Sequence, residues 1–210
     1  WDGLVQGSVE RQAKERGFGI RVGKLRSQGL VPWDGKSPQI VLENVKLTSQ
    51  EQGDLEIDVD LLTIELGGTF PSFEPKSIAA KGVFVSAPNV PALVALERDA
   101  KQGELSKTPF ALRDVRLRVA SLSEAVPATV VGKASEITGA NGEIRFADLT
   151  LEVPIPFVDL TLGPASVDLT RKEGQTKVVF DDLKAVTLAL DDEAKKASVV
   201  VAPLSSAVVD

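Results

Sequence analysis

Four acidic side chains occupy alternate positions in one short stretch, GDLEIDVDLLTIELGG at residues 53–68. Asp54, Glu56, Asp58 and Asp60 alternate there with leucine, isoleucine and valine. Carboxylate oxygens are the ligands that Ca²⁺ and Mg²⁺ prefer, so this stretch raises the hypothesis of a metal site. Along a β-strand, however, alternate residues lie roughly 6.6 Å apart, too far for neighbouring carboxylates to share one ion at about 2.3–2.6 Å. The alternation therefore favours a strand with an acidic, solvated face and an apolar opposite face.

The rest of the chain offers little to nucleophilic or redox chemistry. It contains no histidine and no cysteine, so it lacks the usual general base, the thiol nucleophile and any thiolate metal ligand. The glycines of GFGIRVG, residues 17–23, have the wrong spacing for a dinucleotide-binding loop. The net charge of −6 argues against nucleic acid as a partner. We therefore expect no catalytic residue, no bound metal, no cofactor and no enzymatic activity.

Hydrophobic periodicity predicts a mainly β chain that begins with a short helix. Residues 3–16 carry a rough apolar stripe at helical spacing, and Gly17 is a plausible stop for that helix. Period-two alternation follows. A second helix is predicted near 89–103, with Asn89 as its N-cap and Gly103 beyond its end. The strand signals between the two helices lie at 18–23, 39–48, 54–66 and 77–86, and most of the chain after the second helix is predicted to be β again.

Turn signals punctuate the second half of the chain. Asn141-Gly142 is the strongest short hairpin signal, and KEGQ at 172–175 is a weaker one. Pro154 and Pro156 interrupt an apolar run, and because proline cannot donate to a ladder they indicate a sheet edge, a bulge or a strand break.

A short pattern recurs through the chain: an apolar residue, any residue, Asp or Asn, then Val or Leu. LRDVRL starts at residue 112, FADLTL at 146 and FDDLKA at 180, which gives a period of 146 − 112 = 34 and 180 − 146 = 34. LENVKL at 42 has the same pattern, and IAAKGVFV near 78 is a poor match for the gap. The pattern predicts side-by-side units of two strands each, although so short a pattern also arises by chance in a β-rich chain.

The order of elements resembles a family of bacterial envelope proteins. A helix LVQGSVERQAKERGF runs into GIRVGKLR and then PQIVLENVKLT. PKSIAAKGVFVSAPNVPALVALERDA and TPFALRDVRL follow. Together they resemble the N-terminal region of AsmA-like and TamB-like proteins. The opening WDGLVQGSVERQAKERGFGIRVGKLRSQGL is also similar to the start of the type II secretion protein N family, but that family's Y-G-G-x-x-x-G segment is absent, with only LGGTF at 66–70 in its place.

The resemblance implies a curled antiparallel sheet, or β-groove, forming one elongated domain over 1–210. The helix of 1–17 would follow an inner-membrane anchor upstream of Trp1, and the β-groove would occupy 18–210 in the periplasm of a Gram-negative bacterium. It further implies an apolar groove that holds or passes phospholipid acyl chains and supports the envelope. The alternative is a non-catalytic structural component of an envelope machine, such as a secretion system, with a closed core and an edge strand that binds a protein.

If acyl chains bind, alternation selects the side chains that would line the groove, although a closed core would use the same ones. These candidates are Ile57, Val59, Leu61, Val83, Val85, Val115, Leu117, Leu149 and Leu151.

Overall fold

The computed structural model describes residues 2–15, 17–30, 37–49, 55–69, 72–90, 92, 107–121, 128–155, 158–172, 175–181, 186–190 and 208–209. One helix and eleven strands form over these residues, and the chain is mainly β as predicted. The elements are α1 (Asp2–Glu15), β1 (Phe18–Gln28), β2 (Gln39–Ser49), β3 (Glu56–Thr69), β4 (Ser72–Ala87), β5 (Phe110–Val119), β6 (Val130–Ala140), β7 (Glu143–Ile155), β8 (Val158–Lys172), β9 (Gln175–Asp181), β10 (Val186–Leu190) and β11 (Val208–Val209).

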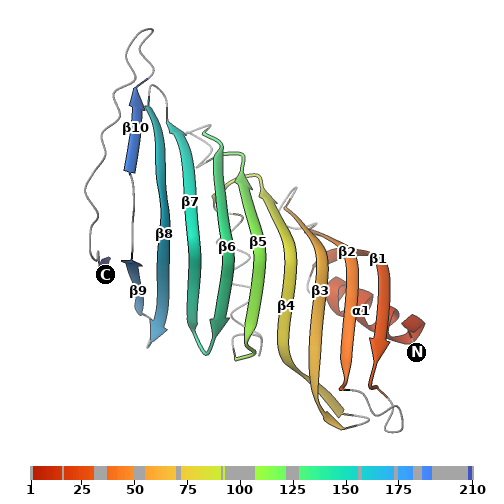
Figure 1. The fold of residues 1–210 in the computed structure, drawn as a ribbon. Helices are drawn as coiled ribbons and strands as arrows, with labels where there is room; N and C mark the ends of the chain where they lie inside the picture. Colours follow the sequence, from red (N-terminus) through yellow and green to blue (C-terminus); the bar gives the residue numbers. More distant parts are fainter. Residues whose placement is uncertain are drawn as a thin grey trace.

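The strands form one open sheet in which sequence neighbours lie side by side (Figure 1). The order runs β1-β2-β3-β4-β5-β6-β7-β8-β9-β11, and β10 also pairs with β8. The prediction of an antiparallel sheet is wrong at one junction, because β4 and β5 pair in parallel. Parallel neighbours require a long crossover connection, and residues 88–109 between these two strands supply it. The sheet is therefore mixed, with one parallel seam between two antiparallel meanders.

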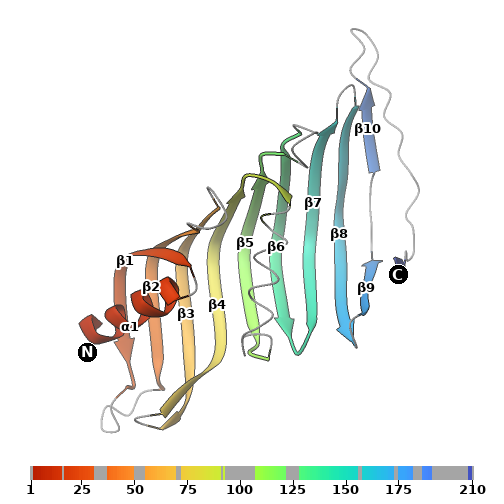
Figure 2. The same ribbon diagram turned by 180° about the vertical axis from the view of Figure 1, so that it is seen from behind.

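The N-terminal helix ends where its sequence predicts. Gly17 adopts a left-handed φ of 77°, and its N–H donates to the carbonyl of Lys14 at 3.0 Å. A glycine in this conformation just past a helix satisfies a free carbonyl of the last turn. The chain then enters β1, and α1 lies against one face of the sheet at its β1 end (Figure 2). No helix over the described ranges has the length and apolar character that a membrane span needs.

The second predicted helix lies almost entirely outside the described residues. Only Asn89, Val90 and Ala92 of that segment are described, and there the Ala92 N–H donates to the Asn89 side-chain oxygen at 2.9 Å. This is the hydrogen bond expected of an N-cap residue.

The Asn-Gly hairpin is confirmed. Asn141 and Gly142 have φ values of 52° and 82°, and Ala140 pairs with Glu143 across the turn between β6 and β7. Positive φ at both central residues is the conformation that favours Asn-Gly. Pro154 lies near the end of β7, beyond the last residue that pairs with β6, so its missing N–H interrupts no bond to that neighbour.

Candidate functional site

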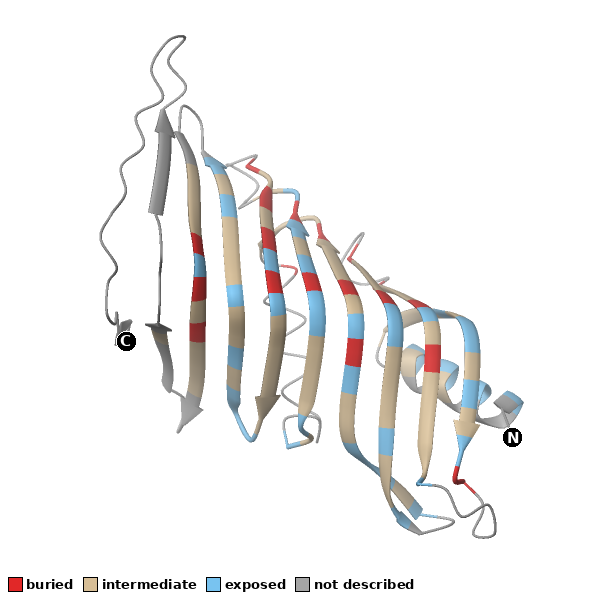
Figure 3. Ribbon diagram, viewed as in Figure 1, coloured by how far each residue is buried: buried red, intermediate tan, exposed pale blue. Residues whose placement is uncertain are grey.

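One face of the sheet collects the aliphatic side chains, and we call it the apolar face. Its buried centre contains Leu42, Val45, Val59, Ala80, Val83, Val115 and Ala134. These residues come from β2 to β6, so five consecutive strands share the same layer of buried side chains. Buried positions recur from strand to strand on β2–β6 and again on β8 (Figure 3).

Eight of the nine predicted groove residues lie on this face, in two adjacent rows. The first row follows the register from Ile57 to Val85, Leu117 and, past Gly132, Leu151. Directly paired residues of neighbouring strands share a face, so this row runs without a break across β3–β7. The second row contains Val59, Val83, Val115 and Leu149.

Leu61 is the exception, and its predicted place on the apolar face is wrong. Its side chain is 38% exposed, and it pairs with Glu43 on one side and Lys81 on the other. The apolar face takes Leu62 instead. The apolar positions of β3 therefore step from Val59 to Leu62, three residues rather than two.

The same three-residue step occurs on every strand from β1 to β7. Two successive residues point away from the apolar face at that level, and we call this line of residue pairs the crease. The flanking apolar residues stay paired, as Val22 with Val45 and Leu25 with Leu42 show for β1 and β2. The pairs of the crease are Gly23-Lys24, Glu43-Asn44, Asp60-Leu61, Lys81-Gly82, Arg113-Asp114, Ser135-Glu136 and Ala147-Asp148.

The crease resembles a β-bulge repeated in register. A one-residue slip in a single strand would turn half of its side chains to the wrong face. Because every strand from β1 to β7 makes the slip at the same level, the register is kept and the apolar face stays continuous. Above and below the crease, alternation is simply offset by one residue.

The crease explains the repeated sequence pattern. Asn44, Asp114 and Asp148 all adopt left-handed φ values, of 53°, 54° and 51°. Asn and Asp tolerate this conformation better than most residues, which accounts for their place in the pattern. Gly82, with φ 65°, occupies the equivalent position in β4, so the poorly matching segment IAAKGVFV does belong to the series. Asp182 of the last copy lies outside the described residues.

Gly82 is required for a second reason besides its backbone. The carboxylate of Asp60 on the neighbouring strand occupies the place where a Cβ at position 82 would stand. A side chain at position 82 would force the Asp60 side chain to move, and this favours glycine over the asparagine or aspartate of the other strands.

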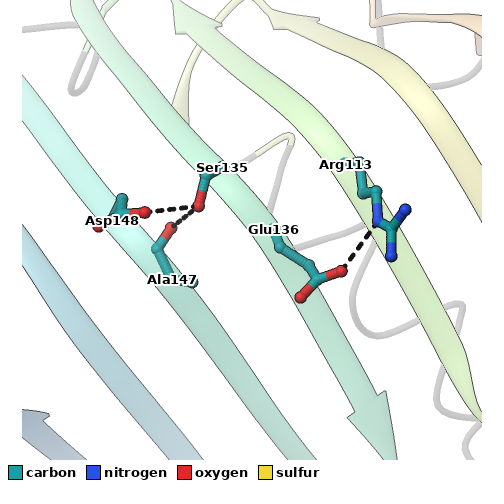
Figure 4. A network of polar contacts seen from close by, with 5 residues as sticks. All are labelled: Arg113, Ser135, Glu136, Ala147 and Asp148. Carbon is teal, nitrogen blue, oxygen red and sulfur yellow. Dashed lines mark hydrogen bonds and ion pairs between the residues drawn. The ribbon is translucent and has the colours of Figure 1, made fainter.

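Polar side chains of the crease contact one another across β5–β7 (Figure 4). The Ser135 hydroxyl lies 2.8 Å from Oδ2 of Asp148 and 3.2 Å from the carbonyl of Ala147. Its single proton serves one acceptor at a time, and the carboxylate is the stronger. Next to it, Nε of Arg113 donates to Glu136 at 3.0 Å. These contacts link the side chains of neighbouring strands at the level of the crease.

Many large side chains on the apolar face remain partly exposed. No isoleucine or phenylalanine side chain that the structure describes is buried, and Val85, Leu117, Leu149 and Leu151 are half-buried. A sheet whose apolar face is covered by a second layer normally buries such residues. Over the described residues the strands form one layer, and these side chains keep part of their surface accessible.

Glu56, Asp58 and Asp60 of β3 lie on the opposite, charged face of the sheet. Asp58 pairs with Lys46, and Glu56 accepts a hydrogen bond from the Lys46 amine at 2.8 Å. That hydrogen bond, helped by the charges of Glu56 and Asp58, raises the pKa of Lys46 above its ordinary 10.5, against the opposing effects of desolvation and Arg21. Asp54 lies outside the described residues. No group of three or more potential metal ligands occurs among the residues with a described placement.

Neither of the two best-defined hollows over the described strands involves the predicted groove residues. The larger, of about 530 Å³, lies near the β6–β7 turn and is lined by residues such as Phe110, Gly139 and Arg145. The second lies at one end of β2–β4, beside Pro38 and Gly67.

Simple alternation missed the half of the apolar face that lies on the other side of the crease. The signal was present, because an apolar residue precedes each Asp or Asn of the repeated pattern by two positions and another follows it directly. The missed row follows the register through Leu25, Leu42, Leu62, Ala80, Leu112, Ile137, Phe146 and Val167.

No protein-family model matches this chain, and a search of the curated proteins finds no match either.

Proposed function

We propose that this chain is a lipid-handling module that holds acyl chains against its apolar face. The observation that carries the proposal is the continuous apolar face of a single open layer, with half-buried aliphatic side chains from β3 to β7. Burial of apolar surface provides roughly 25 cal/mol per Å², so an acyl chain would gain affinity wherever it covers these side chains.

The resemblance to AsmA-like and TamB-like proteins supports the same proposal and extends it. On that basis the partner is a phospholipid, and the module acts in the periplasm, held by an anchor in the inner membrane. Its contribution would be to envelope integrity, without catalysis. The crease supports an extended binding surface as well, since it keeps apolar side chains in register over seven strands.

Native mass spectrometry of the chain purified from a bacterial host, followed by lipid extraction, tests the proposal. We expect bound phospholipid, lost in the Leu151→Glu variant. Thr150→Glu is the matched control, because Thr150 is the adjacent residue on the charged face and pairs with Lys133. Thermal melting of both variants separates loss of binding from loss of fold. A lipid-free protein, or equal loss in both folded variants, would contradict the proposal.

A second candidate is a structural component of an envelope machine, such as a type II secretion system. It is favoured by β1, an eleven-residue strand with a described neighbouring strand on one side only. Such an edge offers backbone donors and acceptors to an incoming strand. This candidate predicts a lipid-free, stoichiometric complex with a protein partner in the same mass spectra.

A further inference from the structure

The charged face of β4–β6 carries a concentration of positive charge in a chain that is acidic overall. Five exposed cations lie there on three adjacent strands, and two like-charged pairs lie directly opposite one another: Lys81 with Arg113, and Arg116 with Lys133. Like charges at directly opposite positions destabilise a sheet. We call this group the basic patch, consisting of Lys81, Arg113, Arg116, Arg118 and Lys133.

Most of this charge is not neutralised within the described part of the chain. Arg113 lies 3.0 Å from Glu136, and Lys133 lies 3.8 Å from Glu152. Lys81, Arg116 and Arg118 have no ion pair to any described residue. The patch thus retains at least three cations that are available to an external anion.

Apolar side chains lie among these cations. Leu61, paired with Lys81, is the one large apolar side chain classed as exposed among the described residues. Phe84 lies directly opposite Arg116 and is half-buried. Cations interleaved with an exposed leucine and a partly exposed phenylalanine are typical of surfaces that lie in the interfacial region of a bilayer.

The shape of the patch favours a membrane over an acidic peptide. The hollow near the β6–β7 turn and the one beside Pro38 include no residue of the basic patch, whose cations lie on the face of three paired strands. Peptides are usually held in grooves or added at sheet edges, whereas a bilayer presents an extended plane of headgroups. We propose that the basic patch, with Leu61 and Phe84, docks this chain peripherally on an anionic lipid bilayer.

This docking is independent of acyl-chain binding, because it uses the opposite face of the sheet. The interaction is weak and reversible, since each cation near an anionic surface adds only modestly to affinity. It is also salt-sensitive, because exposed charges are screened over roughly 10 Å at 0.1 M salt.

Vesicle flotation with the full chain tests this inference. Phosphatidylcholine vesicles with about 30 mol% phosphatidylglycerol should bind the chain at low salt, and pure phosphatidylcholine vesicles should not. Raising the salt to roughly 0.5 M should release it. Equal binding to both vesicle types, or binding that is indifferent to salt, would overturn the inference.

Two charge-matched variants locate the surface. Arg116→Gln with Arg118→Gln should weaken binding by roughly 10- to 30-fold. Arg21→Gln with Lys24→Gln removes the same charge from the charged face of β1 and should leave binding within about twofold. An equal loss in both would mean that net charge alone attracts the vesicles, which contradicts a defined patch. Leu151→Glu should leave vesicle binding unchanged, and this separates the docking from the proposed acyl-chain site.

Discussion

On the charged face, the regions β1–β3 and β4–β6 arrange their ionic side chains in opposite ways. In the first region Lys24 lies opposite Glu43, and Lys46 lies opposite Asp58 on β3, so these two direct pairs attract. The like-charged neighbours Arg21 and Lys46 are compensated there by Glu56 and Asp58. In the second region two of the direct pairs bring cations together.

The two regions share the same apolar face and the same crease, so the difference between them is confined to the charged face. The first region uses its charges to support the sheet. The second keeps two like-charged pairs beside the attractive contact of Arg113 with Glu136, and such repulsion is expected of a surface that serves binding rather than stability.

The largest loss in the free energy of unfolding should come from substitutions on the apolar face, which both regions share. Leu42→Ala should lower the free energy of unfolding by about 2–5 kcal/mol, because Leu42 is only 1% exposed. Leu112 lies on the same row and is half-buried, so Leu112→Ala should cost clearly less. Urea denaturation of both variants gives the comparison. Equal losses would show that both regions are covered equally.

Replacing a left-handed residue of the crease should destabilise the fold by a similar amount in both regions. Asn44→Val and Asp114→Val should each destabilise by about 1–2 kcal/mol, since a β-branched residue is strained at a left-handed φ. Asn44→Asp and Asp114→Asn are the controls, because both residue types tolerate this conformation. Urea midpoints of the four variants suffice. A valine variant as stable as its control would contradict the left-handed assignment.

Reversing one charge should lower the stability of the fold in the first region and raise it in the second. Glu43→Lys should destabilise by about 0.2–1 kcal/mol, because it places a third cation beside Lys24 and Arg26. Arg116→Glu should stabilise by a similar amount, because it sets an acid opposite Lys133. Thermal melting at low salt should show the contrast, and high salt should reduce it. Shifts of the same sign would remove the distinction between the regions.

The smallest expected effect is on the pH dependence of stability, through the contact of Lys46 with Glu56. Its pKa is raised in the folded state, so its contact with Glu56 contributes fully below pH 10.5 and is lost as the pH rises through the folded value. Urea midpoints should therefore fall slightly more between about pH 9 and pH 11 in the parent chain than in Lys46→Gln. An identical pH dependence in the two proteins would show that the contact does not persist in solution.

Strand content could be predicted from the sequence because alternation and turn residues are local signals. Asn141-Gly142 marks its hairpin, and eight of the nine residues selected by alternation lie on the apolar face. Leu61 was misplaced because alternation was extended through Asp60, where the crease adds one residue. The correct reading needed the three-residue spacing from Val59 to Leu62.

Strand direction could not be read in the same way. Side chains alternate identically in parallel and antiparallel strands, so the pattern of β5 does not reveal that it runs alongside β4. The length of the connection, residues 88–109, was the available signal. A two-residue turn forces antiparallel pairing, whereas a connection of that length also permits the parallel one.

The parallel seam has a consequence for how the chain assembles. β1–β4 is a meander in which every strand pairs with its sequence neighbour, and β5–β9 is another. Within each meander the contacts are local, which favours rapid formation, whereas the seam must wait for a long loop to close. A break in the connection between Ala87 and Phe110 would leave both meanders with their hairpins intact. We therefore expect the two meanders to nucleate separately, and expect fragments divided at this connection to reconstitute the sheet on mixing.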